Sequence, residues 1–103
     1  MKFVKVVVTV PEAEAAKLRQ AIGNAGGGRL GNYSHASFSV KGVGRFLAKD
    51  GASPAIGKVG RLEEVTEERI EVTCEKEKLA TIIEAIRRNH PYEEPVIDVY
   101  ALL

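Results

Sequence analysis

The chain is short and nearly neutral: it has 103 residues, 45% of them hydrophobic and 28% charged, and its formal net charge is +1. These values predict one globular domain over residues 1–103 and exclude a coiled coil, which ten glycines would interrupt. No apolar run approaches the ~20 residues of a membrane-spanning helix, and the near-zero charge argues against nucleic-acid binding. The single cysteine, Cys74, excludes an internal disulfide. We therefore expect a cytoplasmic protein with neither a membrane nor a nucleic acid as partner.

The first two predicted elements are a strand and a helix. Residues 2–10 are rich in β-branched side chains, and valines recur at every second position, as in a strand with one apolar face. Pro11 suits the first position of a helix. Apolar side chains then recur at helical steps of three and four, at Ala15, Leu18, Ile22 and Ala25. Three glycines, Gly26 to Gly28, end this helix.

The second half of the chain adds two strands, a helix and a final strand. Residues 35–41 alternate apolar and polar side chains and predict a strand, whereas residues 42–60 form a long connection without clear periodicity. A strand follows at about residues 62–74, a helix at 75–89 and a strand at 96–102. The order β-α-β-β-α-β predicts an α+β fold with a four-stranded antiparallel sheet and both helices on one face.

Two helices on one face leave the other face of the sheet open. Phe3, Val7 and one side of the last strand place apolar groups there, and an exposed apolar patch of this kind usually marks association. We therefore expect a homo-oligomer whose sheets pack together. The alternative is a monomer with a half-polar open face.

The glycines and the positive charges are concentrated in the middle of the chain. All ten glycines lie between Gly23 and Gly60, and this window holds five basic residues and one acidic residue, against ten and thirteen elsewhere. Neither the G-x-x-x-x-G-K-S/T nor the G-x-G-x-x-G phosphate-binding pattern is present. A looser anion site would use Arg45, Lys49 or Lys58. The alternative is a flexible loop with solvated lysines.

The segment His90 to Pro95 (HPYEEP) places a histidine, a phenol and two carboxylates close together. His35, His90 and Glu93 or Glu94 would be an acceptable ligand set for a transition metal, provided that the fold brings the two histidines together, within one subunit or between two. The same groups suit acid–base chemistry. In the structural alternative, the segment ends a helix and turns the chain into the last strand.

Two other groups are interpreted as structural. The acidic run that precedes the second helix is interpreted mainly as solvated strand surface; it consists of Glu63, Glu64, Glu67, Glu68 and Glu71. Contact of this run with basic loops of a neighbouring subunit is the alternative. Cys74 faces the core side of its strand and is expected to be inert.

Several motifs of the chain resemble a known family. They are GNYSH (31–35), G-x-G-x-F (42–46), G-A-x-P-x-I-G (51–57), E-x-V-x-E-x-R-I-E (63–71) and HPYEEP (90–95). Together they resemble, over nearly the whole chain, the YqfO-type domain. That domain is an insert of the NGG-interacting factor three-like family and also occurs as a stand-alone protein. The HPYEEP segment also looks like the copper-tolerance CutA family, and both resemble the trimeric, PII-like version of the ferredoxin-like fold.

The resemblance implies a ferredoxin-like, PII/CutA-like trimer. Its working loop is the connection between the second and third strands, residues 42–60. Clefts between subunits are then lined by a set of polar and aromatic side chains: Tyr33, His35, His90, Tyr92 and Glu93, with Arg45 and Lys58 supplying positive charge.

The resemblance also limits what can be transferred. In the long members of the family, the dinuclear metal ligands lie in domains on either side of the insert, so none of them is carried over to this chain. Ala48 stands where a proline is common, and Ala36 stands where a cysteine is frequent. The second departure weakens any metal or redox site near His35.

Three functions follow in order of preference. The first is a small oligomeric binding or regulatory module without enzymatic activity, which takes a small anionic ligand. The second is divalent metal binding through His35, His90 and Glu93. The third is an enzyme or accessory domain that acts on a small phosphorylated metabolite.

Overall fold

Strands and helices alternate along the chain in the predicted order in the structure, a computed structural model that describes residues 2–103. The elements are β1 (Phe3–Pro11), α1 (Glu12–Asn24), β2 (Phe38–Leu47), β3 (Leu62–Glu75), the short 3₁₀ helix η1 (Lys76–Lys78), α2 (Leu79–Asn89) and β4 (Ile97–Ala101). Met1, which belongs to the predicted domain 1–103, lies outside the described residues.

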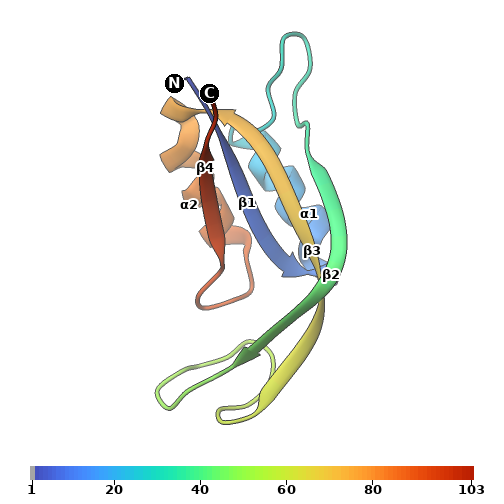
Figure 1. The fold of residues 1–103 in the computed structure, drawn as a ribbon, viewed down its shortest axis with the longest axis vertical. Helices are drawn as coiled ribbons and strands as arrows, with labels where there is room; N and C mark the ends of the chain where they lie inside the picture. Colours follow the sequence, from blue (N-terminus) through green and yellow to red (C-terminus); the bar gives the residue numbers. More distant parts are fainter. Residues whose placement is uncertain (1) are drawn as a thin grey trace.

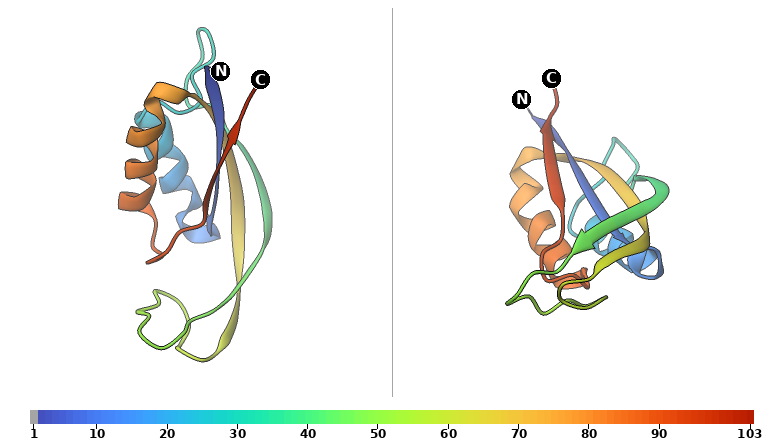
Figure 2. Two further views of the ribbon diagram at one scale, coloured as in Figure 1. Left: turned by 60° about the vertical axis from the view of Figure 1, so that its left-hand side comes forward. Right: turned by 60° about the horizontal axis from the view of Figure 1, so that its bottom comes forward.

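The strands form one antiparallel sheet in the order β2-β3-β1-β4. Both helices lie on one face of the sheet, as Figures 1 and 2 show, and no other described element covers the opposite face. This arrangement confirms the predicted α+β fold of the ferredoxin-like type. Between Lys2 and Leu103, no helix has the length and apolar character needed to cross a membrane.

The hydrophobic core lies between the sheet and the helices. Every second residue of β1 from Val4 to Val10 is buried, and the antiparallel register places Val6 opposite Val72 and Val8 opposite Ile70. The helices contribute the predicted stripes, with Ala15, Leu18, Ile22, Ile82 and Ile86 buried. Because burial of one large aliphatic side chain stabilises by about 1.5–3 kcal/mol, these stripes hold both helices on the sheet.

Cys74 belongs to this core and is buried. Burial raises the pKa of its thiol, and the carboxylate of Glu75 raises it further. Since the thiolate is the reactive form of cysteine, both effects keep Cys74 unreactive, as the sequence predicts.

Near its centre, the open face of the sheet exposes less apolar surface than predicted. Val7 is only 3% exposed within the single chain, and Phe3 is half-buried. Exposed apolar side chains of this face are found instead on the two outer strands, at Phe38 of β2 and Tyr100 of β4. The register places both on the same side as Val7.

The connection predicted over residues 42–60 begins as a strand. β2 continues to Leu47 because its backbone pairs with β3 as far as Leu62, and the loop proper starts at Ala48. Glycines at positions 42 and 44 concealed this strand, since glycine is uncommon in strands. β2 and β3 therefore extend beyond β1 as a two-stranded hairpin, which sweeps under the turn between α2 and β4 (Figures 1 and 2).

The second strand also begins later than predicted, at Phe38. His35 has a φ of 61°, in the left-handed region, which a strand does not allow. Its ring packs where a Cβ atom of Gly23 would lie, so this contact depends on the glycine. A tertiary contact thus decides the backbone of a segment whose local alternation predicted a strand. The helix predicted over residues 75–89 is present as η1 followed by α2.

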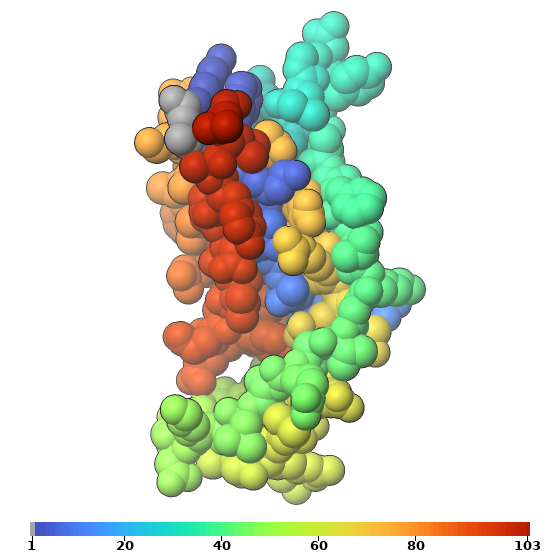
Figure 3. All heavy atoms as spheres, in the orientation of Figure 1, coloured from blue at the N-terminus to red at the C-terminus, as the bar shows by residue number. Residues whose placement is uncertain are grey.

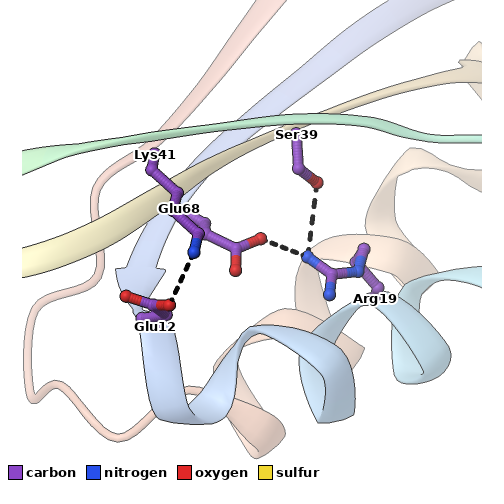
Figure 4. Close-up of polar contacts among 5 residues, drawn as sticks. All are labelled: Glu12, Arg19, Ser39, Lys41 and Glu68. Carbon is purple, nitrogen blue, oxygen red and sulfur yellow. Dashed lines mark hydrogen bonds and ion pairs between the residues drawn. The ribbon is translucent and has the colours of Figure 1, made fainter.

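Polar contacts tie α1 to the two long strands (Figure 4). The guanidinium of Arg19 donates to the carboxylate of Glu68 on β3, and also to Oγ of Ser39 on β2 at 3.3 Å. Nζ of Lys41 lies 2.9 Å from Oε1 of Glu12 at the start of the helix. Glu68 is half-buried by these contacts, so the prediction of a merely solvated acidic run is wrong at this position.

Candidate ligand-binding groove

A groove of about 660 Å³ lies where the hairpin passes beneath the α2–β4 turn. One wall is formed by β2 and the loop after it, and the other by residues 92–96 of the turn. In Figure 3 the groove opens between the orange-red turn and the green end of the hairpin. The lining is mainly apolar and includes Val40, Val43, Phe46, Leu47, Pro54, Ile56 and Val96. Its volume lies within the range of small-molecule pockets, about 300–1,000 Å³.

Glu67 is a buried carboxylate in the lining of this groove, only 7% exposed. Its Oε2 accepts a hydrogen bond of 2.7 Å from the hydroxyl of Tyr92. Gly42 is its neighbour on β2, and a Cβ atom at Gly44 would overlap its Oε1. Gly44 thus leaves β2 bare where the carboxylate lies, whereas a Cβ atom at Gly42 would meet nothing within 4 Å. The interpretation of Glu67 as solvated strand surface is therefore wrong.

Tyr92 links the α2–β4 turn to both strands of the hairpin. Its ring packs edge-on against Phe46, with 5.6 Å between the ring centroids, and lies 5.1 Å from the imidazole of His90. Burial raises the pKa of the Tyr92 phenol, and the hydrogen bond to Glu67 raises it further. The phenol therefore keeps its proton at neutral pH and remains a hydrogen-bond donor to the carboxylate.

His90 has a structural role in the turn. Its Nε2 lies 2.7 Å from the carbonyl oxygen of Thr9, and its Nδ1 lies 3.1 Å from the backbone nitrogen of Tyr92. A carbonyl only accepts and a backbone N–H only donates, so Nε2 carries the proton and Nδ1 accepts. Both ring nitrogens are engaged, and neither is free to bind a metal in this arrangement.

Glu93 connects the turn to the loop that follows β2. Its Oε1 accepts a hydrogen bond of 3.2 Å from the backbone N–H of Ser53. The HPYEEP segment therefore makes three separate attachments: His90 to the end of β1, Tyr92 to β3, and Glu93 to the loop. The structural interpretation of this segment agrees with these contacts.

Tyr33 and His35 lie away from the groove, and Tyr33 is 77% exposed. The imidazole of His35 contacts the side-chain oxygen of Asn24 at 3.0 Å, at the end of α1, whereas His90 contacts Thr9, just before α1 begins. The helix between these two points has 13 residues and is about 20 Å long. The structure therefore does not bring His35 and His90 together within one protomer.

The predicted metal site is thus not formed by a single copy of the chain. Among residues 2–103, no three His, Cys, Asp or Glu side chains are grouped so that they could hold a metal ion. A ligand set of His35, His90 and Glu93 stays a prediction for a site shared between two copies, in which His90 would have to give up one of its two hydrogen bonds.

The predicted basic residues also divide between two places. Arg45 lines the groove, and its Nε lies 3.3 Å from Oε2 of Glu64. Lys49 lines the groove as well, whereas Lys58 does not. The structure therefore brings together Arg45, Tyr92 and Glu93 of the predicted site and leaves the remaining members outside the groove.

Glu67 is the residue of this groove that the sequence does not predict. Its position in an acidic run suggests a solvated face, and only the pairing of β2 with β3 places it opposite Gly42. Gly44 is the available signal, because a glycine in a strand leaves room for a bulky neighbour on the next strand.

No family model matches the chain. Curated proteins do match it. A GTP cyclohydrolase 1 type 2 homolog from Mycobacterium tuberculosis is 50% identical over 99 residues, which are 96% of this chain and 26% of that protein. The homolog of the same name from Bacillus subtilis is 46% identical over 96 residues, which are 93% and 26% of the two chains. The chain thus spans about a quarter of the length of the curated relatives it matches.

Solved structures give a similar result. A Bacillus cereus protein related to NIF3 superposes with a TM-score of 0.85 and 42% identity, over 98% of this chain and 26% of that chain. CutA from Archaeoglobus fulgidus gives a TM-score of 0.70 at 16% identity, covering 97% and 83% of the two chains. The Bacillus subtilis GlnK–ATP complex gives 0.66 at 18% identity, covering 98% and 82%. The chain is therefore homologous to one segment of the NIF3-related proteins and shares the fold of CutA and GlnK, as its motifs predict.

Proposed function

We propose that the chain is a small oligomeric binding module without enzymatic activity, and that the groove beneath the α2–β4 turn holds its ligand. The observation that carries this proposal is the buried carboxylate of Glu67, held by the half-buried Tyr92, in a mainly apolar groove of small-molecule size. A few placed polar groups in an apolar pocket are what orients a small ligand. GlnK, whose solved structure is a complex with ATP, shares this fold.

The oligomer in this proposal is a homotrimer, which rests on the resemblance to PII- and CutA-like proteins. Phe38 and Tyr100 expose apolar surface on the open face of the sheet, at 64% and 49% of their areas. The outer edges of β2 and β4 have no strand beside them among the described residues. Unpaired edges and exposed apolar side chains both favour association between copies.

Light scattering on the full chain tests the oligomer. The protomer has a mass of 11.2 kDa, and we expect particles of three such masses. A monomer at every concentration would contradict this part of the proposal.

A thermal-shift screen of nucleotides and phosphorylated metabolites tests the ligand. A compound that binds only the native state raises the melting temperature. We expect Arg45→Ala, in the groove wall, to reduce this rise. Lys58→Ala is the matched control because Lys58 comes from the same basic window but lies outside the groove. Equal effects of the two variants would mean that the ligand is attracted by diffuse charge and does not occupy the groove.

The two alternative functions keep their own tests. Calorimetry with zinc, copper and nickel, repeated on His35→Ala, tests metal binding between copies. Turnover of phosphorylated metabolites, measured with and without Tyr92→Phe, tests an enzymatic role of the groove.

A further inference from the structure

Among the described residues, the buried carboxylate of Glu67 has no cationic partner. No Lys, Arg or His nitrogen of residues 2–103 forms an ion pair with it, and its one hydrogen-bond donor is the neutral phenol of Tyr92, on Oε2. No side-chain oxygen or nitrogen among these residues is both fully buried and without a hydrogen bond. Oε1 therefore keeps some contact with solvent, and it lies against Gly44, which lines the groove together with Glu67.

The positive side chains nearest along the strands are engaged elsewhere. Arg69 lines the groove, but its Nε donates to Oε2 of Glu71 at 3.1 Å. Arg45, on the wall formed by β2, lies against Glu64. A carboxylate that is more than nine-tenths buried without a cation is unfavourable, and a cation supplied from outside would relieve it.

We propose that the groove takes a ligand whose positively charged N–H group binds Oε1 of Glu67 and whose apolar body packs between the groove walls. The inference rests on the proposed function, because it names the ligand class for the same groove. An amidinium or a primary ammonium on an aromatic or aliphatic body has the required chemistry, since a charge-assisted N–H···O bond suits a buried carboxylate. The rings of Phe46 and Tyr92 offer the apolar surface for that body.

A metal ion fits this position less well than an organic cation. Divalent cations take several oxygen or nitrogen ligands, and Glu67 offers one free carboxylate oxygen in a mainly apolar lining. No group of three metal-ligating side chains exists within residues 2–103. An N–H group needs only the one acceptor, so it matches what the groove provides.

Three compounds of nearly equal shape test the proposal by calorimetry on the full chain. Benzamidine carries the positive amidinium, benzamide is its neutral counterpart, and benzoate is negative. We expect benzamidine to bind at least about tenfold more tightly than benzamide, because a hydrogen bond between charged groups adds roughly one decade of affinity. Benzoate is expected not to bind at Glu67. Equal affinities for benzamidine and benzamide, or no binding of benzamidine, would overturn the proposal.

Two charge-removing variants locate the binding. Glu67→Gln keeps the shape of the side chain and is expected to weaken benzamidine binding about tenfold. Glu94→Gln is the matched control, because Glu94 lines the same groove but is exposed, and a change of less than about twofold is expected there. Equal losses in the two variants would show diffuse attraction and overturn the assignment to Glu67.

Two further measurements test the proposal if Glu67→Gln does not fold, or if a second copy of the chain supplies the cation. If Glu67→Gln is unfolded by circular dichroism, the carboxyl carbon resonance of Glu67 in the wild-type protein decides. It should move on addition of benzamidine and stay in place with benzamide, and the reverse result counts against the proposal. If Glu67→Gln instead dissociates the oligomer in light scattering, a side chain of another copy already occupies Oε1, and the ligand proposal is wrong.

This inference and the proposed function fail in different ways. If a nucleotide raises the melting temperature through Arg45 and benzamidine does not bind, the proposed binding function stands and only the cationic-ligand proposal is wrong. If neither kind of compound binds in the groove, both proposals are wrong.

Discussion

Gly44 on β2 lies directly against the carboxylate of Glu67 on β3, so that a Cβ atom at position 44 would overlap Oε1 of Glu67. The hydroxyl of Tyr92 donates to the same carboxylate, at 2.7 Å from Oε2. A strand glycine, a buried acid and a tyrosine of the α2–β4 turn therefore form one packed unit at the base of the hairpin. A change in one of them should be felt by the other two.

Removing the Tyr92 hydroxyl should destabilise the fold. Tyr92→Phe keeps the ring against Phe46 but leaves the buried carboxylate without its donor, which costs about 1–3 kcal/mol in the free energy of unfolding. Urea denaturation measures this loss. Tyr33→Phe is the matched control: Tyr33 is 77% exposed, so its change should stay within about 0.5 kcal/mol. Similar losses for the two variants would mean that the Tyr92–Glu67 bond contributes nothing specific.

A methyl group at position 44 should break the same unit. Gly44→Ala forces the Glu67 carboxylate away from the Tyr92 hydroxyl, and we expect a loss of about 1–3 kcal/mol. Gly42→Ala is the control on the same strand, because a Cβ atom there meets nothing within 4 Å, and its effect should be neutral or stabilising by about 0.4–1 kcal/mol.

The double variant of Gly44→Ala with Tyr92→Phe makes the test sharper. Both changes break the same hydrogen bond. The double variant should therefore lose less stability than the sum of the two single losses, with a coupling energy of about 0.5–3 kcal/mol. Strict additivity in denaturation experiments would show that the glycine and the tyrosine act independently of each other.

Alkaline pH should weaken the fold through Tyr92. The ordinary pKa of tyrosine is 10.0, and burial and Glu67 raise the pKa of Tyr92 above this value in the folded chain. Above pH 10, the unfolded chain therefore loses a proton that the folded chain retains, and stability falls as pH rises. Below pH 10 this contribution is complete and constant.

The comparison with Tyr92→Phe isolates this effect from the titration of lysines. We expect the free-energy difference between wild type and Tyr92→Phe to shrink as the pH increases from 9 to 11, measured by denaturation at each pH. A difference for Tyr92→Phe that stays flat over this interval would mean that its phenol titrates alike in both states.

The sequence predicts the elements whose signals are local. Valines alternating along β1 and the apolar stripes of α1 and α2 are set by periodicity within a few residues, and the structure buries them as expected. The end of β2 cannot be predicted in this way, because Gly42 and Gly44 have little strand preference and only the pairing with β3 makes them a strand.

The groove depends even more on contacts between residues far apart in the sequence. Glu67 and Tyr92 are 25 residues apart in sequence, and Glu93 reaches Ser53 across 40 residues. The composition of HPYEEP marks it as a candidate site, but the partners of its side chains depend on how far the hairpin extends under the turn. For the same reason the sequence predicts the basic window as one unit, although Arg45 lines the groove and Lys58 does not.

The contact between Glu93 and Ser53 should order the loop that follows β2. Glu93→Gln removes the charge from the acceptor of the Ser53 amide and should speed exchange of that amide with solvent about two- to tenfold, the range for loss of about 0.5–1.5 kcal/mol. The amide of Ala52, which donates within the loop to the carbonyl of Lys49 at 3.1 Å, is an internal reference. Hydrogen exchange followed residue by residue gives both rates.

Glu94→Gln is the matched variant, since Glu94 also lines the groove but makes no hydrogen bond within the described chain. In Glu94→Gln, the Ser53 amide should exchange with solvent at the same rate as in the wild type. If Ser53 and Ala52 speed up together in Glu93→Gln, the single hydrogen bond holds the whole loop over the groove, and ligand affinity should fall with it. If neither amide responds, the loop is ordered by its apolar contacts alone, and Glu93 is not the residue through which the turn positions it.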